Sequence, residues 1–303
     1  MRSLLITGAS GFLGGYACRL LSPYWQIWGT HNTQPVTLPT GDSIALDLTH
    51  EPSIDAVWQR VKPDAVIHTA ALSKASQCQQ FPDRSYRVNV LGAVHLANRC
   101  ARHAVPLIFT STDLVFNGTT PPYDEAALPA PLNTYGRHKA LAETQILAAY
   151  PEATVCRLPL LFGPQTPTAT CFLQNFLATI TAGQPLTLYT DEIRPPAAVP
   201  DVVQGQRLAI EQNQTGLLHL GGPQRLSRYE FGLLMADSFG LPTAALTPCR
   251  QSAIALVTPR PPDVSLNSQK AFALGYAPQN METALRAIAD ASHLTSAFEA
   301  CCC

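Results

Sequence analysis

LLITGASGFLGG, residues Leu4 to Gly15, begins as an apolar run typical of a buried strand and ends in spacing typical of a helix. Glycines stand at Gly8, Gly11 and Gly14, although a glycine inside a strand or helix costs roughly 0.5–1 kcal/mol relative to alanine. A phosphate-binding turn explains all three: Gly8 permits the tight turn, Gly11 lets the backbone approach a pyrophosphate, and Gly14 lets helix and strand pack closely. The helix N-terminus offers free N–H groups to the phosphates. The segment therefore predicts a dinucleotide site at Gly8, Ser10, Gly11, Phe12, Leu13 and Gly14, with a purely structural turn as the alternative.

Strand-like and helix-like segments alternate through the first half of the chain. Apolar strand patterns occupy residues 3–8, 26–30, 64–71, 106–116 and 153–163, and helical spacing occupies 11–21, 53–63, 85–104 and 135–150. Nearly continuous apolar strands in such alternation are typical of a parallel sheet that is buried on both faces. Right-handed crossovers make that sheet doubly wound, so the sequence predicts an α/β Rossmann fold.

The pattern becomes less regular after Gly163, where prolines cluster within 195–200 and 259–262. Short strands are expected at 185–189 and 216–222, and a helix is expected at 228–239. We therefore expect a dinucleotide-binding domain over residues 1–163 and a smaller α/β substrate-binding lobe over residues 164–303, either beside the first domain or interleaved with it.

Composition and charge restrict the class of function. The 303 residues are 46% hydrophobic and 14% charged, with a net charge of −1, which does not fit a nucleic-acid binder or a protein of anionic membrane surfaces. No signal peptide is recognisable and no run reaches the ~18 apolar residues of a membrane span, so a cytoplasmic protein is expected. The nine cysteines lack metal-ligand spacing, so no metal is expected, and Cys301, Cys302 and Cys303 at the end have no assigned role.

Two further segments concern the cofactor. The second strand leads into Thr30, His31 and Asn32, and none of these is the carboxylate that would bind an NAD ribose. We place His31 and Asn32 in the cofactor site, favour NADP and leave NAD open. After the strand pattern that ends near His68, the small residues Thr69, Ala70 and Ala71 would let a cofactor lie along the backbone. His68 itself is expected to be a packed, neutral histidine.

A separate group of residues indicates proton and hydride transfer. Tyr135 and Lys139 are four residues apart on a predicted helix and therefore share one face. A tyrosine pKa of about 10 is too high for proton transfer near neutral pH, and a nearby ammonium is expected to lower it. Thr112 follows an apolar strand that includes Thr110, at the sheet edge where doubly wound folds bind ligands. Thr112, Tyr135 and Lys139 then form a catalytic triad in which the hydroxyls polarise a carbonyl and Tyr135 gives the proton.

The GxxGxxG spacing resembles that of the extended branch of the short-chain dehydrogenase/reductase superfamily. Three segments, STDLVFNG (111–118), YDEAALPAPLNTYGRHKALAE (123–143) and RPPDVSLNSQKAFALG (260–275), closely resemble the dTDP-4-dehydrorhamnose reductase family. The resemblance extends from Leu4 to about Gly275 and is strongest between Phe109 and Glu143. It implies reduction of a keto sugar carried on a nucleotide diphosphate.

The resemblance also implies roles for single residues. Thr112, Tyr135 and Lys139 match the family's catalytic positions. Among cofactor contacts, it implies that Asp47 and the adjacent Leu48 lie near the adenine ring, that Asn89 shapes the site and that Leu158 passes the nicotinamide. It also implies that Asp113, Phe116 and Asn133 lie near the substrate. Arg194 and Arg260 would then contact the diphosphate, since a guanidinium can pair with phosphate through two hydrogen bonds. The alternative role for Asp47 is to cap a turn. The alternative role for the two arginines is to form ion pairs within the protein.

Three functions stay open at this point. The first is an NAD(P)-dependent reductase of a nucleotide-linked keto sugar, a small-molecule substrate. The second is another sugar-nucleotide epimerase or dehydratase, or a reductase of a different carbonyl. The third is a non-catalytic, NADP-binding regulatory subunit resembling that of methionine adenosyltransferase. Residues 72–82 and 191–203 depart from the reductase pattern on the sugar side, so the substrate is less defined than the chemistry, and a homodimer is one option for assembly.

Overall fold

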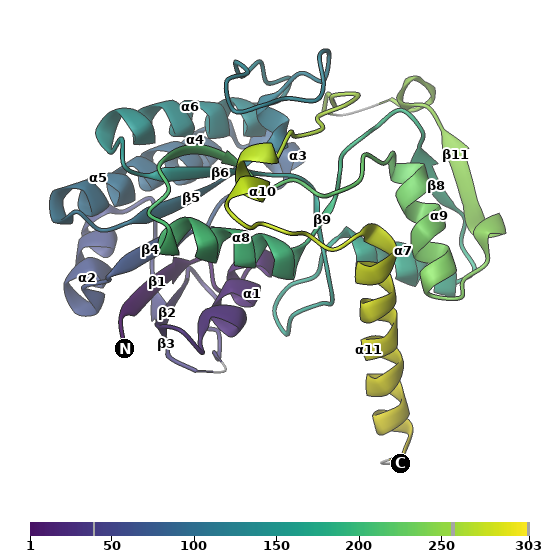
Figure 1. Cartoon of the computed structure of the whole chain (residues 1–303), viewed down its shortest axis with the longest axis horizontal. Helices are drawn as coiled ribbons and strands as arrows, with labels where there is room; N and C mark the ends of the chain where they lie inside the picture. Colours follow the sequence, from purple (N-terminus) through teal and green to yellow (C-terminus); the bar gives the residue numbers. More distant parts are fainter. Residues whose placement is uncertain (39, 256–257, 302–303) are drawn as a thin grey trace.

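The computed structural model describes residues 1–38, 40–255 and 258–301 and is built around a seven-stranded sheet. All neighbouring strands of this sheet run parallel, in the order β10-β6-β5-β4-β1-β2-β3 (Figure 1). The strands are β1 (Ser3–Thr7), β2 (Gln26–His31), β3 (Asp42–Ala45), β4 (Ala65–His68), β5 (Leu107–Thr112), β6 (Thr154–Leu158) and β10 (Gly216–His219). The strand order reverses between β1 and β4, and ligands bind at such a point in doubly wound sheets. The predicted Rossmann fold is confirmed.

Helices cover both faces of this sheet, because its strands are apolar on both sides. On one face lie α1 (Phe12–Leu21) and α8 (Val199–Glu211), in one apolar cluster with Leu4 and Ile6 of β1. On the other face lie α2 (Glu51–Val61), α5 (Ala93–His103) and α6 (Thr134–Ala149), in a cluster with Leu5 and Val66 (Figure 1). The shorter helices before α5 are α3 (Ala75–Gln80) and α4 (Pro82–Tyr86).

A second group of elements packs around its own apolar cluster, on the right of Figure 1. It contains α7 (Phe172–Thr181), β8 (Leu186–Tyr189), α9 (Arg228–Ser238), β11 (Leu246–Cys249) and α11 (Met281–Cys301), with β8 paired parallel to β11. Smaller elements are β7 (Leu161–Phe162) paired with β9 (Ala197–Ala198), the helix α10 (Gln269–Ala273), and 3-10 turns at Asp113–Val115, Thr243–Ala245 and Gln251–Ala253.

The chain returns to the main sheet late in the sequence. The strand expected at 216–222 is β10, which pairs with β6 at the edge of the seven-stranded sheet and so is not part of the second group. Helix α8, which the sequence analysis did not predict, packs on the same sheet. Both elements lie after residue 163, so the chain interleaves the two groups, while the domain boundary at 163 stays a prediction.

The long helix expected over 85–104 is divided. Residues Arg87–Gly92 form a π-helical turn between α4 and α5. Gly92 lies so close to the chain at Leu48 that a Cβ would be 2.6 Å from the Leu48 carbonyl oxygen. Helical periodicity alone does not reveal this turn or the approach of Gly92 to Leu48, a residue distant in sequence.

No helix in the described ranges is long and apolar enough to cross a membrane. Cys301 is the last residue of α11, whereas Cys302 and Cys303 lie outside the described residues.

Candidate active site

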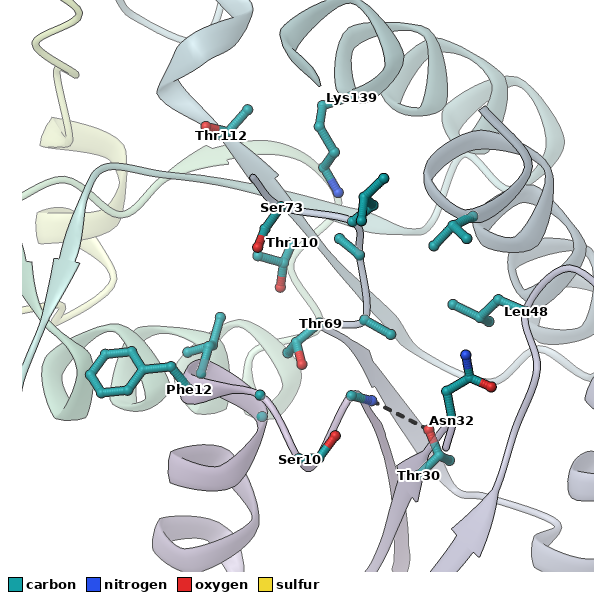
Figure 2. Close-up of a pocket in the computed structure, with 18 of the residues that line it drawn as sticks. Ser10, Phe12, Thr30, Asn32, Leu48, Thr69, Ser73, Thr110, Thr112 and Lys139 are labelled. Atoms are coloured by element: carbon teal, nitrogen blue, oxygen red, sulfur yellow. Dashed lines mark hydrogen bonds between the residues drawn. The ribbon is translucent and has the colours of Figure 1, made fainter. Parts of the chain in front are cut away.

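The glycine turn has the conformation that its sequence predicts. Gly8 has φ +74°, in the left-handed region that glycine adopts without strain. A Cβ at Gly14 would lie 2.1 Å from the Gly8 carbonyl oxygen, so only glycine permits this approach of α1 to the turn. The turn is tied to β2, since the Gly8 N–H donates to Thr30 Oγ1 (3.3 Å) and the Ala9 N–H donates to the Thr30 carbonyl (2.7 Å) (Figure 2).

A cavity of about 610 Å³ opens above this turn, at the carboxyl ends of the sheet strands. It extends from Asn32 and Leu48 at one end to Thr112 and Lys139 at the other (Figure 2). Of the predicted cofactor and catalytic residues, those that line it are Gly8, Ser10, Gly11, Phe12, Leu13, Gly14, His31, Asn32, Asp47, Leu48, Thr69, Ala70, Ala71, Thr110, Thr112, Tyr135, Lys139 and Leu158.

Asn89 is the predicted cofactor residue that does not line the cavity. Its side chain is buried and bonded at both ends to Leu72, with Oδ1 accepting from the Leu72 N–H (2.8 Å) and Nδ2 donating to the Leu72 carbonyl (3.0 Å). Leu72 lines the cavity. The amide holds the loop that forms the wall, which fits a residue that shapes the site, and a direct contact of Asn89 with the cofactor stays a prediction.

The lining carries excess positive charge. Lys139, Arg84 and Arg87 line the cavity, whereas Asp47 is its one carboxylate in the described ranges. Hydrogen bonds from Thr49 lower the pKa of Asp47, so it is ionised near neutral pH. Such a lining attracts an anionic ligand.

Sequence reasoning missed several residues of this wall, and the two arginines matter most. They are three positions apart, at the end of α4 and the start of the π-helical turn, and both reach the cavity. This spacing could have suggested a shared face, but only the fold shows that the face meets the cavity. The other missed lining residues are Leu46, Thr49, Leu72, Ser73, Val88, Ser111 and Leu161, whereas Thr30 and Pro159 lie in segments that the sequence already assigned to the cofactor.

The inner end of the cavity holds Tyr135 and Lys139. Lys139 is 2% exposed, and its Nζ lies 3.9 Å from the centre of the Phe109 ring. Burial lowers the pKa of Lys139 to about 7, and the charge of Glu143 opposes this effect. Burial raises the pKa of Tyr135 above its usual range. The expectation that Lys139 depresses the tyrosine pKa is therefore wrong, since desolvation is the largest influence on Tyr135.

The Thr112 hydroxyl is hydrogen-bonded to neighbouring groups of the protein. Its Oγ1 donates to Asp113 Oδ1 (3.1 Å) and accepts from the Leu114 N–H (3.2 Å). His68 is confirmed as a packed neutral histidine, since burial lowers its pKa to about 3 and its Nδ1 lies 2.6 Å from Thr7 Oγ1.

The five residues predicted near the substrate do not line this cavity. Arg194 pairs with both oxygens of the fully buried Asp113, with Nε donating to Oδ2 at 2.8 Å. Arg260 pairs with Glu192, with Nη1 donating to Oε2 at 3.0 Å. Both arginines therefore pair with protein carboxylates, as the ion-pair alternative predicted, although the Arg260 side chain is half exposed and uses only Nη1 in its pair, so its diphosphate contact stays a prediction.

The remaining two substrate-side residues are used in packing and capping. Phe116 is buried and stacks on Tyr123 with ring centres 4.0 Å apart. Asn133 caps α6, since its Oδ1 accepts from the Gly136 N–H (2.9 Å).

Comparison with known proteins agrees with this architecture. The family described as RmlD substrate binding domain matches residues 1–293. The β subunit of methionine adenosyltransferase 2 from Xenopus laevis is 29% identical over 281 residues, which cover 90% of this chain and 83% of that protein.

Two solved structures share the fold. The dTDP-4-dehydrorhamnose reductase from Bacillus anthracis in complex with NADP has a TM-score of 0.84 at 23% identity, covering 95% of this chain and 98% of that one. The UDP-glucose 4-epimerase from Thermotoga maritima with UDP-glucose has a TM-score of 0.82 at 20% identity, covering 97% and 99%.

Proposed function

Since the chain belongs to the RmlD substrate binding domain family of the extended short-chain dehydrogenase/reductase superfamily, we propose that it is an NADP-dependent reductase of a nucleotide-linked keto sugar. One observation carries the proposal. A single cavity has the glycine turn at one side and Thr112, Tyr135 and Lys139 at its inner end. The residues expected near the sugar do not line this cavity, so the proposed substrate follows from family membership rather than from geometry.

The residues present fit a dinucleotide. Cβ atoms at Gly8 and Gly14 would meet backbone atoms at 2.8 Å or closer, so the close packing of this turn needs glycine. In the proposal, residues 8–14 hold the pyrophosphate, Asp47 and Leu48 lie by the adenine, and Lys139 reaches the nicotinamide ribose. When bound, the reduced cofactor supplies the hydride.

The chain itself supplies the proton. Because burial raises the pKa of Tyr135, this phenol stays protonated near neutral pH and holds the proton that a substrate oxygen would accept, but it gives up that proton only when a nearby positive charge lowers its pKa. A cationic Lys139 beside it would stabilise the phenolate that remains. The Thr112 hydroxyl must leave Asp113 before it can donate to a carbonyl, since it has one proton.

The pairing of Asp113 argues against a dehydratase. A dehydratase needs a free acid beside the threonine to protonate a leaving hydroxyl, and Asp113 is engaged by Arg194 through two charge-assisted hydrogen bonds. An epimerase is not separated from a reductase by this contact.

The charge of the lining supports NADP. NADP carries a further phosphate, and the two arginines of the lining, Arg84 and Arg87, outnumber its one carboxylate in the described ranges. The end of β2 offers Thr30, His31 and Asn32, which do not repel a phosphate. NAD is the alternative, and the preference is decided by comparing the two affinities.

A regulatory subunit is the second candidate, because of the 29% identity to a methionine adenosyltransferase β subunit. It would bind NADP without turnover. Incubation with NADPH and a panel of nucleotide-linked keto sugars separates the two, since a reductase oxidises NADPH with at least one. Tyr135→Phe should then abolish turnover and leave NADPH binding within about twofold. NADPH binding without NADPH oxidation across the whole panel would reject the reductase.

A cytoplasmic location and dimer formation stay predictions.

A further inference from the structure

A buried ionic network lies directly behind the inner end of the cavity. Arg157 is 1% exposed and Glu143 is 3% exposed. Arg157 Nε donates to both Glu143 oxygens (3.1 and 3.2 Å), and Nη2 donates to Oε2 (2.7 Å). The Ser111 hydroxyl donates to Glu143 Oε1, so the carboxylate is held from two strands. Beyond Arg157 the network continues to the neutral ring of His219, whose Nε2 lies 3.3 Å from Nη1 and whose Nδ1 lies 3.2 Å from the Tyr123 carbonyl oxygen.

Such a network is not explained by stability alone. Desolvating two charges is costly, and replacing a buried ion pair with apolar residues is often neutral or stabilising. The groups that lie next to this ion pair therefore indicate what function it has. Glu143 follows Lys139 by one helical turn on α6, so the two side chains lie on the same face. Ser111 itself lines the cavity.

Lys139 has little else to stabilise its charge. Burial favours its neutral form, and its Nζ lies over the face of the Phe109 ring. The groups that face it from other elements are His68 of β4, which is neutral, and the Cys78 thiol of α3, whose own pKa is raised by burial. Arg84 and Arg87 share the cavity lining with it and are cations. Glu143 is thus the carboxylate whose charge favours the ammonium in the described part of the chain, and the Cys78 thiol, which burial keeps mostly neutral, adds a smaller effect in the same direction.

We infer that Glu143, fixed by Ser111 and Arg157, is a positioning residue that keeps Lys139 cationic. Arg157 takes the hydrogen bonds of the carboxylate, so Glu143 forms its ion pair with Arg157 and not with Lys139. The charge of Glu143 reaches Lys139, but its oxygens do not capture the ammonium. The three donors of Lys139 stay available to a ligand and to Tyr135. This inference rests on the same site as the proposed function but makes no use of turnover.

The test follows the titration of Lys139 itself. The chain has four lysines, Lys62, Lys74, Lys139 and Lys270, so lysine labelled with ¹³C at Cε gives few NMR signals, and Lys139→Arg assigns the relevant one. Glu143→Gln keeps the size of the side chain and removes its charge. We expect the Lys139 midpoint to fall by about one pH unit or more, as an opposite charge at close range normally contributes. Glu152→Gln, an exposed site just after α6, should leave the midpoint unchanged.

A double variant controls for the cation that Glu143→Gln leaves behind. Glu143→Gln with Arg157→Met removes both charges, which also protects folding if the single variant is too unstable. The Lys139 midpoint should still fall, by less than in the single variant. An unchanged Lys139 midpoint in a folded double variant would overturn the inference. It would mean that the charges of Glu143 and Arg157 cancel one another at Lys139. If turnover is found, the alkaline limb of its pH profile should move to lower pH by the same amount, whereas a merely structural network would lower Tm and leave the limb in place.

Discussion

Arg194 and Asp113 form a buried ion pair that joins the segment before α8 to the end of β5, next to Thr112. Asp113 is fully buried and accepts from both Arg194 and Thr112. The pair therefore fixes the turn that follows the catalytic strand, using an arginine that comes from a distant part of the sequence.

Removing Arg194 should destabilise the protein strongly. Arg194→Ala leaves the carboxylate of Asp113 buried without its cation, which costs roughly 3–5 kcal/mol. Burial already raises the pKa of Asp113, and loss of Arg194 raises it further, so protonation relieves the loss. Urea unfolding should show a smaller deficit at pH 5 than at pH 7.5. Arg207→Ala, which breaks a surface pair with Glu211, should cost about 0.5 kcal/mol or less at either pH. Equal losses for the two variants would contradict the assignment.

The glycine turn should tolerate substitution at one glycine of α1 and not at its neighbour. A Cβ at Gly14 would lie 2.1 Å from a backbone oxygen, whereas a Cβ at Gly15 meets its closest atom at 3.3 Å. Gly14→Ala should therefore displace α1 from the turn and weaken NADPH binding at least tenfold. Gly15→Ala should keep binding within about threefold and gain part of the ~1 kcal/mol helix propensity difference. Fluorescence titration with NADPH and thermal unfolding measure the two effects, and equal affinities would refute the steric argument.

Local chemistry explains why the sequence predicted so much of this site. Gly8, Thr112, Tyr135 and Lys139 are placed by short-range patterns, namely a strand end, a turn and helical spacing. Once the fold is doubly wound, these patterns converge on the switch point between β1 and β4.

The failures have a common cause in partners that are distant in sequence. Arg194 was expected to meet a phosphate but meets Asp113, 81 residues away. Asn89 was expected among the cofactor residues, and its amide is bonded to Leu72 across 17 residues. The pKa of Tyr135 was expected to fall, yet burial raises it, and burial depends on the whole fold. A motif locates a side chain, but it does not show which other groups compete for it.

The two arginines of the lining should contribute to cofactor affinity. Arg87 acts on Asp47, at the end of the cavity assigned to the adenosine, so its guanidinium lies near the position proposed for the adenosine phosphate. Arg87→Ala should weaken NADPH more than NADH, by about tenfold against about threefold, because NADPH carries the additional phosphate. Arg102→Ala, on an exposed site at the end of α5, should change neither. Calorimetric titration with both cofactors measures this, and an equal loss for the two would remove Arg87 from phosphate recognition.

The buried histidines should make the protein sensitive to acid. Burial lowers the pKa of His68 to about 3 and that of His219 to about 3, whereas in the unfolded chain each titrates at about 6.5. The unfolded state therefore binds protons that the folded state excludes. The stability linked to these rings is fully present above pH ~6.5 and is lost as pH falls toward 3. Each histidine contributes about 1.4 kcal/mol per pH unit within that window, or about 2.7 kcal/mol for both. His68→Gln should halve this slope in urea unfolding between pH 4 and 6, while His50→Gln, at an exposed position, should not. An unchanged slope in His68→Gln would mean that His68 binds its proton equally well in the folded and unfolded states, which would contradict its assignment as a buried neutral ring.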